Sequence, residues 1–201
     1  MPRFLFISSV AVVAAAALIS GGPAAAQSAP AVTYDHDVFF FAGRYENQDF
    51  GYSFNPVNAP YDSDSVIGGG YQQFFSNWNG LRFGAEVGLA ARFSAVTSAE
   101  LWGGFVGRYD GFAIGPVRIS PALTFGLSAV SGYVTSEAEQ VPGLGKDVPV
   151  LFYLGPELNF SLDSQPNIEA FIRIQHRSGG YGTIAKIDAA NADTLGIRWK
   201  F

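Results

Sequence analysis

Hydrophobic and polar residues alternate along much of this chain. In residues 81–92 every second position is apolar, namely Leu81, Phe83, Ala85, Val87, Leu89 and Ala91. The intervening positions include Arg82, Glu86 and Arg92. Residues 117–127 and 150–162 repeat the pattern. Because successive side chains of a strand point to opposite faces, each stretch predicts a β-strand with one apolar and one polar face.

Five further stretches follow the same alternation less strictly: 37–46, 64–75, 99–109, 168–178 and 191–201. Together with the first three they make eight predicted strands. A strand of about ten residues tilted near 40° rises roughly 25 Å, which is enough to cross the apolar band of an outer membrane. The sequence therefore predicts an all-β fold, an eight-stranded antiparallel transmembrane β-barrel without a second domain.

The connectors between these strands alternate in length. Residues 76–80, 110–111 and 163–167 are short connectors, whereas 47–61 and 135–149 are long. In outer-membrane barrels short turns face the periplasm and longer loops face the outside, so both chain ends are predicted to be periplasmic.

Two prolines fall inside predicted strands. Pro121 and Pro156 cannot donate to a strand ladder, so we expect β-bulges at both positions.

The amino terminus is typical of a secretory signal peptide. It has a basic start at Arg3, a mostly apolar run over residues 4–19 and small residues up to Ala26. Residues 1–26 are therefore predicted to be a signal peptide and 27–201 the barrel. Export together with this strand pattern predicts the outer membrane of a Gram-negative type of cell.

Composition narrows the function classes. Without Arg3 the predicted mature chain has 11 basic residues against 17 acidic ones, a net charge of −6, which argues against a nucleic acid partner. The chain has no cysteine, which excludes a disulfide framework and a thiolate metal site. Beyond the signal, no stretch approaches the roughly 18 apolar residues that a membrane helix requires.

Charged residues occupy the face predicted to line the barrel. An eight-stranded barrel is just wide enough for side chains to fill it. We therefore expect a paired polar plug rather than a diffusion pore, built from Arg82, Glu86, Arg92, Glu100, Arg108, Arg118, Glu157 and Arg173.

One predicted strand ends its apolar face with polar residues. In 168–178 the face of Ile168, Ala170, Ile172 and Ile174 continues into His176 and Ser178. One interpretation is that these positions mark the wet rim of the barrel. The other is acyl transfer, in which a histidine, oriented by an acid or amide, takes the proton of a serine.

The last predicted strand offers two partners for the histidine. If residue 168 opposes Phe201, Asp193 lies opposite His176 and Asn191 opposite Ser178. All four side chains are then predicted on the outward face, because Asn191 and Asp193 alternate with Leu195, Ile197, Trp199 and Phe201.

Residues 173–184 (RIQHRSGGYGTI), followed by 191–201, resemble the lipid A 3-O-deacylase family of outer-membrane barrels, also called acyloxyacyl hydrolases. The resemblance implies His176 as general base and Ser178 as nucleophile. It also implies hydrolysis of an ester-linked acyl chain of lipid A, presented by the lipopolysaccharide of the surrounding outer leaflet. The mechanism requires no metal or cofactor.

The chain departs from this family at two positions. The family's acidic residue falls on Asn191, with Asp193 one outward position further along, so a weakened Ser-His-Asn site and a shifted Ser-His-Asp site both stay open. The residue after the serine, often an asparagine that helps to form the oxyanion hole, is Gly179. The backbone N–H of Gly179 or Gly180 can take that role.

Two other functions fit the pattern. A non-enzymatic small barrel would act as a surface or structural protein through loops 47–61 and 135–149, and His176 would then be dispensable. A palmitoyl-transferring barrel would need an acyl-measuring cavity, against which the charged interior positions argue. The pattern carries no signal for an oligomeric state.

Overall fold

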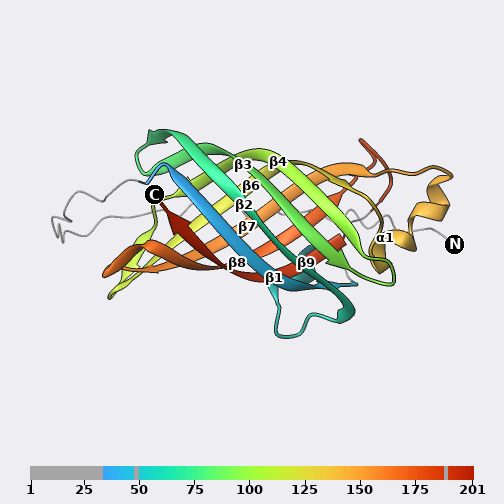
Figure 1. Ribbon diagram of the computed structural model, residues 1–201, viewed down its shortest axis with the longest axis horizontal. Helices are drawn as coiled ribbons and strands as arrows, with labels where there is room; N and C mark the ends of the chain where they lie inside the picture. Colours follow the sequence, from blue (N-terminus) through green and yellow to red (C-terminus); the bar gives the residue numbers. More distant parts are fainter. Residues whose placement is uncertain (1–33, 48–49, 188–189) are drawn as a thin grey trace, which may run out of the picture. The chain divides into compact units, whose positions relative to one another are not determined.

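Eight long antiparallel strands close into a barrel in the computed structural model, which describes residues 34–47, 50–187 and 190–201 (Figure 1). Neighbouring strands pair in the order β4-β3-β2-β1-β9-β8-β7-β6, and a pairing of β4 with β6 closes the ring. A short strand, β5 (Phe112–Ile114), pairs with β6. The long strands are β1 (His36–Glu46), β2 (Tyr61–Trp78), β3 (Leu81–Phe93), β4 (Ser98–Tyr109), β6 (Val117–Val130), β7 (Val150–Leu162), β8 (Gln165–Ser178) and β9 (Ala190–Lys200).

All eight predicted strands and the barrel they form are confirmed. The predicted signal peptide, residues 1–26, lies outside the described residues. No helix in the described ranges is long and apolar enough to span a membrane.

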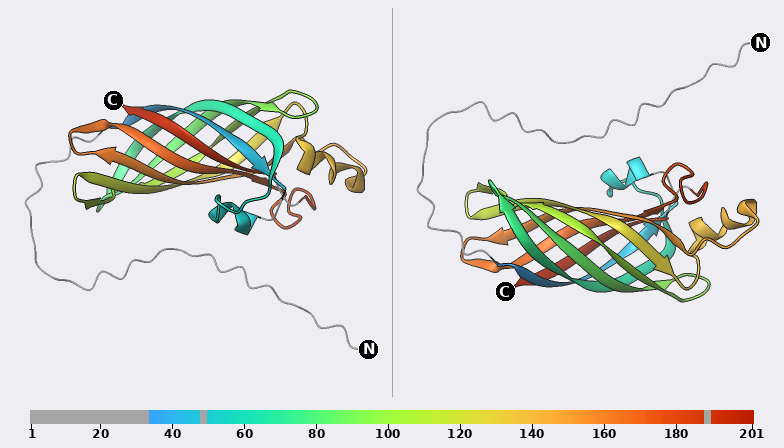
Figure 2. Two further views of the ribbon diagram at one scale, coloured as in Figure 1. Left: turned by 90° about the horizontal axis from the view of Figure 1, so that it is seen from below. Right: turned by 90° about the horizontal axis from the view of Figure 1, so that it is seen from above.

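Short and long connectors gather at opposite ends of the barrel, as predicted (Figure 2). At one end β2 and β3 are joined through residues 79–80, and His36 and Phe201 exchange two backbone hydrogen bonds of 3.1 and 2.8 Å. The other end carries η1 (Phe50–Phe54), α1 (Thr135–Ala138) and η2 (Val141–Leu144).

A network of ion pairs fills the barrel interior. The Arg173 guanidinium contacts Glu86 and Glu157, each at 2.7 Å, and Arg198 contacts Glu157 at 2.7 Å. All four side chains are buried. Charges taken out of water are tolerated when they are paired and hydrogen-bonded, and this network meets that condition. The predicted plug is thus confirmed.

The plug extends into the loop end of the barrel. Glu137, from α1, is fully buried and pairs with Arg92 at 2.5 Å and with Arg177. Arg118 differs from the other predicted interior residues, because it lies at the start of β6, is partly exposed and reaches Asp163 only at 3.9 Å.

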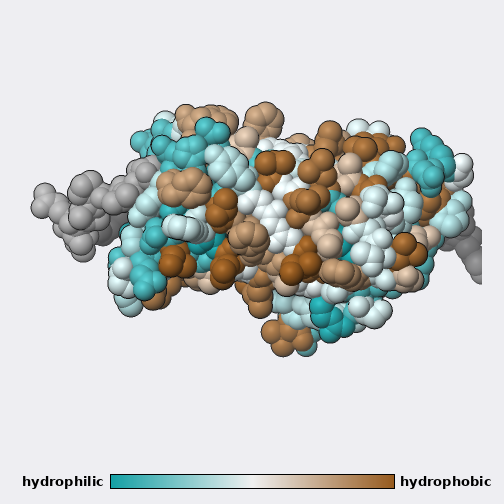
Figure 3. All heavy atoms as spheres, viewed as in Figure 1, coloured by the Kyte–Doolittle hydropathy of each residue, from teal (hydrophilic) through white to brown (hydrophobic). Residues whose placement is uncertain are grey.

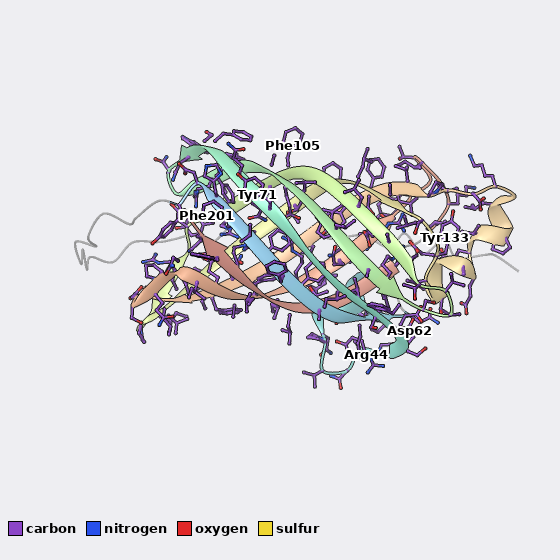
Figure 4. All side chains as sticks on the ribbon, in the orientation of Figure 1. Arg44, Asp62, Tyr71, Phe105, Tyr133 and Phe201 are labelled. Atoms are coloured by element: carbon purple, nitrogen blue, oxygen red, sulfur yellow. The ribbon has the colours of Figure 1, made fainter. Side chains whose placement is uncertain are left out.

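Large apolar side chains cover the outer wall of the barrel (Figure 3). Among them Phe105 is 75% and Leu195 68% exposed, and Figure 4 shows Phe105 projecting away from the strands. So many exposed large apolar side chains are unfavourable in water and are typical of a lipid-facing barrel wall.

The expected bulge is wrong at Pro156, whereas a register change does occur beside Pro121. Pro121 pairs with Leu158, and Pro156 with Leu123, in one uninterrupted β6–β7 register. In the β7–β8 ladder, on the other side of β7, Gly155 and Pro156 have no partners. The same register resumes at Glu157. At Pro156 the missing donor is therefore accommodated by a local gap in the ladder without an extra residue.

At Pro121 the ladder on the other side of β6 changes register, because Arg108 lies opposite Ala122 but Phe112 lies opposite Ile119. Three residues, 109–111, thus face two on β6, which is the extra residue of a bulge.

Candidate functional site

The observed pairing of β8 with β9 differs from the predicted one by two residues. Ile168 lies opposite Trp199, not Phe201, and His176 consequently lies opposite Asn191, not Asp193. A shift of two residues leaves each side chain on its predicted face, because the side-chain period of a strand is two.

Burial agrees with the outward direction of the β9 side chains. Ala190 and Ala192 belong to the buried core inside the barrel. Asn191 and Asp193 alternate with them and therefore point outward.

The side chains of His176 and Asn191 are hydrogen-bonded. Nδ1 of His176 lies 2.6 Å from Oδ1 of Asn191. An amide oxygen can only accept, so this bond places the imidazole proton on Nδ1 and leaves the Nε2 lone pair as the basic position. Histidine-dependent nucleophile activation uses this tautomer, and His176 and Ser178 share one face of β8.

The site is covered, whereas an outward-facing position on a barrel wall was expected to meet lipid directly. His176 is only 8% and Asn191 1% exposed. The ring of Phe50, in η1, lies with its centroid 4.2 Å from that of His176, and η1 packs against β9. Ser178, at the end of β8, is half-buried.

Asp193 is engaged by a different residue. Its Oδ2 accepts a hydrogen bond of 2.7 Å from the Tyr61 hydroxyl at the start of β2. In the ladders Asp193 lies opposite Ile174 on one side and Arg44 on the other. Figure 4 shows Arg44 close to Asp62, at the loop end of β1 and β2. The structure therefore brings Asn191, not Asp193, to the histidine.

The two glycines after Ser178 differ in their backbone bonding. The Gly179 N–H donates to the carbonyl of Ile187 at 3.1 Å, and this bond closes the connector on itself. Gly180 adopts a left-handed conformation with a φ of 61°, and a Cβ there would come within 2.6 Å of the Phe152 ring. Of the two expected oxyanion donors, the Gly180 N–H is thus the better candidate.

Sequence reasoning missed one residue beside this site. Glu46, the last residue of β1, lies opposite Asn191 on the side away from His176 and is 1% exposed. The predicted closure of the barrel could have indicated Glu46, because the first and last strands of a closed antiparallel barrel are neighbours.

In the described part of the chain, no group of three or more histidine, aspartate or glutamate side chains is placed to hold a metal ion.

No protein-family model matches the chain, and no curated protein does. Its structure is similar to that of the outer membrane enzyme PagL, with 16% identity, a TM-score of 0.56 and coverage of 82% of this chain and 99% of PagL. It is also similar to a de novo designed transmembrane β-barrel, with 12% identity, a TM-score of 0.50 and coverage of 83% and 95%. Neisserial surface protein A gives 16% identity, a TM-score of 0.47 and coverage of 83% and 97%. The chain therefore has the fold of a closed eight-stranded antiparallel β-barrel, similar to that of a known outer-membrane barrel.

Proposed function

We propose that this protein is an outer-membrane hydrolase that removes an ester-linked acyl chain from lipid A. The hydrogen bond of His176 with Asn191 carries the proposal, since it orients a basic imidazole nitrogen two residues before Ser178. All three side chains are on the outward face of their strands, and half-buried Ser178 borders a barrel wall of the kind that faces lipid.

In the proposed reaction Nε2 of His176 takes the proton of the Ser178 hydroxyl, and Oγ attacks the ester carbonyl. The Gly180 N–H donates to the oxygen of the tetrahedral intermediate. The imidazolium then gives its proton to the sugar oxygen as the bond between that oxygen and the acyl carbon breaks, and the acyl chain stays on Ser178 as an ester. Water, deprotonated by the same imidazole, releases the fatty acid and restores the serine.

An apolar path beside Ser178 supports an acyl substrate. Ser178 lies opposite Phe152 on β7, Phe152 opposite Leu127 on β6, and Leu127 opposite Gly103 on β4. This row leads to an apolar surface groove of about 300 Å³ at Gly103, lined by residues that include Val87, Leu101, Leu127 and Val150. An acyl chain lying along this row would contact its apolar side chains in place of neighbouring lipids and would occupy the groove.

The second candidate is a surface or structural barrel without catalysis. The burial of His176 under Phe50 favours it, because a buried histidine bonded to a neighbouring strand can act as an anchor for the loop. The hydrolase requires the Ser178 hydroxyl, whereas a structural barrel does not use it.

The proposal is tested with the purified, refolded barrel in mixed micelles containing lipid A. We expect release of free fatty acid by the wild type and its loss in Ser178→Ala and His176→Ala. Ser65, a half-buried serine on β2, provides a matched control, so Ser65→Ala is expected to retain activity. Equal fatty acid release by the wild type and Ser178→Ala would exclude the proposed mechanism.

A further inference from the structure

Three side chains form a row across β1, β9 and β8. Glu46 lies opposite Asn191 in one ladder, and His176 lies opposite Asn191 in the next. Residues directly opposite in antiparallel strands place their side chains on the same side, with Cβ atoms about 4.5–5.5 Å apart. Glu46 therefore faces Asn191 on the outer wall. It lies on the opposite side of Asn191 from His176.

The bonding of the Glu46 carboxylate is incomplete. Oε1 accepts a hydrogen bond from the Ser53 hydroxyl of η1. Oε2 is buried and has no hydrogen-bond partner among the described residues. A buried carboxylate oxygen without a donor lowers stability, so stability alone gives no reason for a glutamate at this position.

Asn191 has the chemistry to connect the two groups. Its amide oxygen already accepts from His176, and its amide nitrogen carries two further protons that a carboxylate oxygen can accept. Asp193 does not offer this connection, because it lies in the next row and accepts from Tyr61.

We propose that Glu46 is a positioning residue that supplies, through Asn191, the negative charge that asparagine itself lacks. This inference rests on the proposed function. When His176 takes the proton of Ser178, the positive imidazolium is stabilised by the Glu46 carboxylate two strands away. The covered, low-dielectric site keeps this attraction effective over that distance. In this arrangement the acid of the site comes from the first strand and reaches the histidine through the last one.

The variant Glu46→Gln tests the charge, because it preserves the shape of the side chain and an oxygen that can accept from Ser53. We expect kcat to fall roughly tenfold with KM unchanged, and the acid limb of kcat against pH to move to lower pH, since a nearby carboxylate favours the protonated imidazole. The double variant Glu46→Gln/Asn191→Asp moves the carboxylate into contact with His176 and is expected to recover most of the lost kcat. Ser53→Ala removes the hydrogen bond but keeps the charge, and should change kcat less than threefold.

A second measurement does not depend on turnover. The chain has two histidines, so in a His36→Gln background NMR follows the titration of His176 alone. We expect its midpoint to lie at lower pH in Glu46→Gln than in the otherwise identical protein. A shifted midpoint without fatty acid release by the wild type would uphold the charge coupling and reject the proposed function. An unchanged midpoint, or a kcat loss that Asn191→Asp does not rescue, would overturn the role of Glu46.

Discussion

His176 and Asn191 face each other across the β8–β9 ladder, and their side chains meet at 2.6 Å. Asn191→Ala removes the acceptor that fixes the imidazole tautomer, so we expect kcat to fall by about 10- to 100-fold with little change in KM. Asp193→Asn, which keeps an oxygen for Tyr61, should leave kcat within about threefold. Steady-state release of fatty acid measures both variants. The reverse order of the two effects would show that Asp193 orients the histidine.

The aromatic cover over His176 leads to a second prediction. Phe50→Ala removes the ring that packs on the imidazole, so His176 should react several-fold faster with diethyl pyrocarbonate in a His36→Gln background. Phe54→Ala is the matched control, because Phe54 packs on Phe50 with ring centroids 5.2 Å apart and is itself 64% exposed. An equal rate for Phe50→Ala and the parent would mean that η1 does not restrict access to the histidine.

The interior network predicts a large stability effect at its centre. Arg173→Met removes the guanidinium that pairs with buried Glu86 and one of those that pair with Glu157, which keeps its contact with Arg198. Loss of the charge partner of Glu86 should cost about 3–5 kcal/mol in the free energy of unfolding. Arg118→Gln breaks a partly exposed pair of 3.9 Å and should cost less than about 1 kcal/mol. Urea unfolding in micelles compares the two. Similar costs would contradict the view that paired charges close the barrel.

The strands of this fold were predictable because two media impose the alternation. Lipid requires apolar residues on one face, and the narrow interior collects residues such as Glu86 and Arg173 on the other. The pairing register was not predictable to the residue. A slip of two residues, from Asp193 to Asn191 opposite His176, keeps every side chain on its face and leaves no trace in the alternation.

The surroundings of the site were harder to predict than its strands. Phe50 lies in a connector without periodicity, so nothing in the sequence indicated that its ring would cover His176. Glu46 ends a predicted strand, yet its position beside Asn191 follows only from the pairing of the first strand with the last. Contacts formed by barrel closure and by loop packing depend on the tertiary structure, which local patterns do not encode.

In the proposed function Ser178, activated by His176, cleaves an acyl ester of lipid A. The most direct measurement is the mass spectrum of lipid A from cells that express the wild type or Ser178→Ala, with equal amounts of each barrel inserted in the outer membrane. We expect the wild type alone to shift lipid A to the mass that follows the loss of one ester-linked acyl chain. An identical spectrum from both, with no such loss, would contradict it.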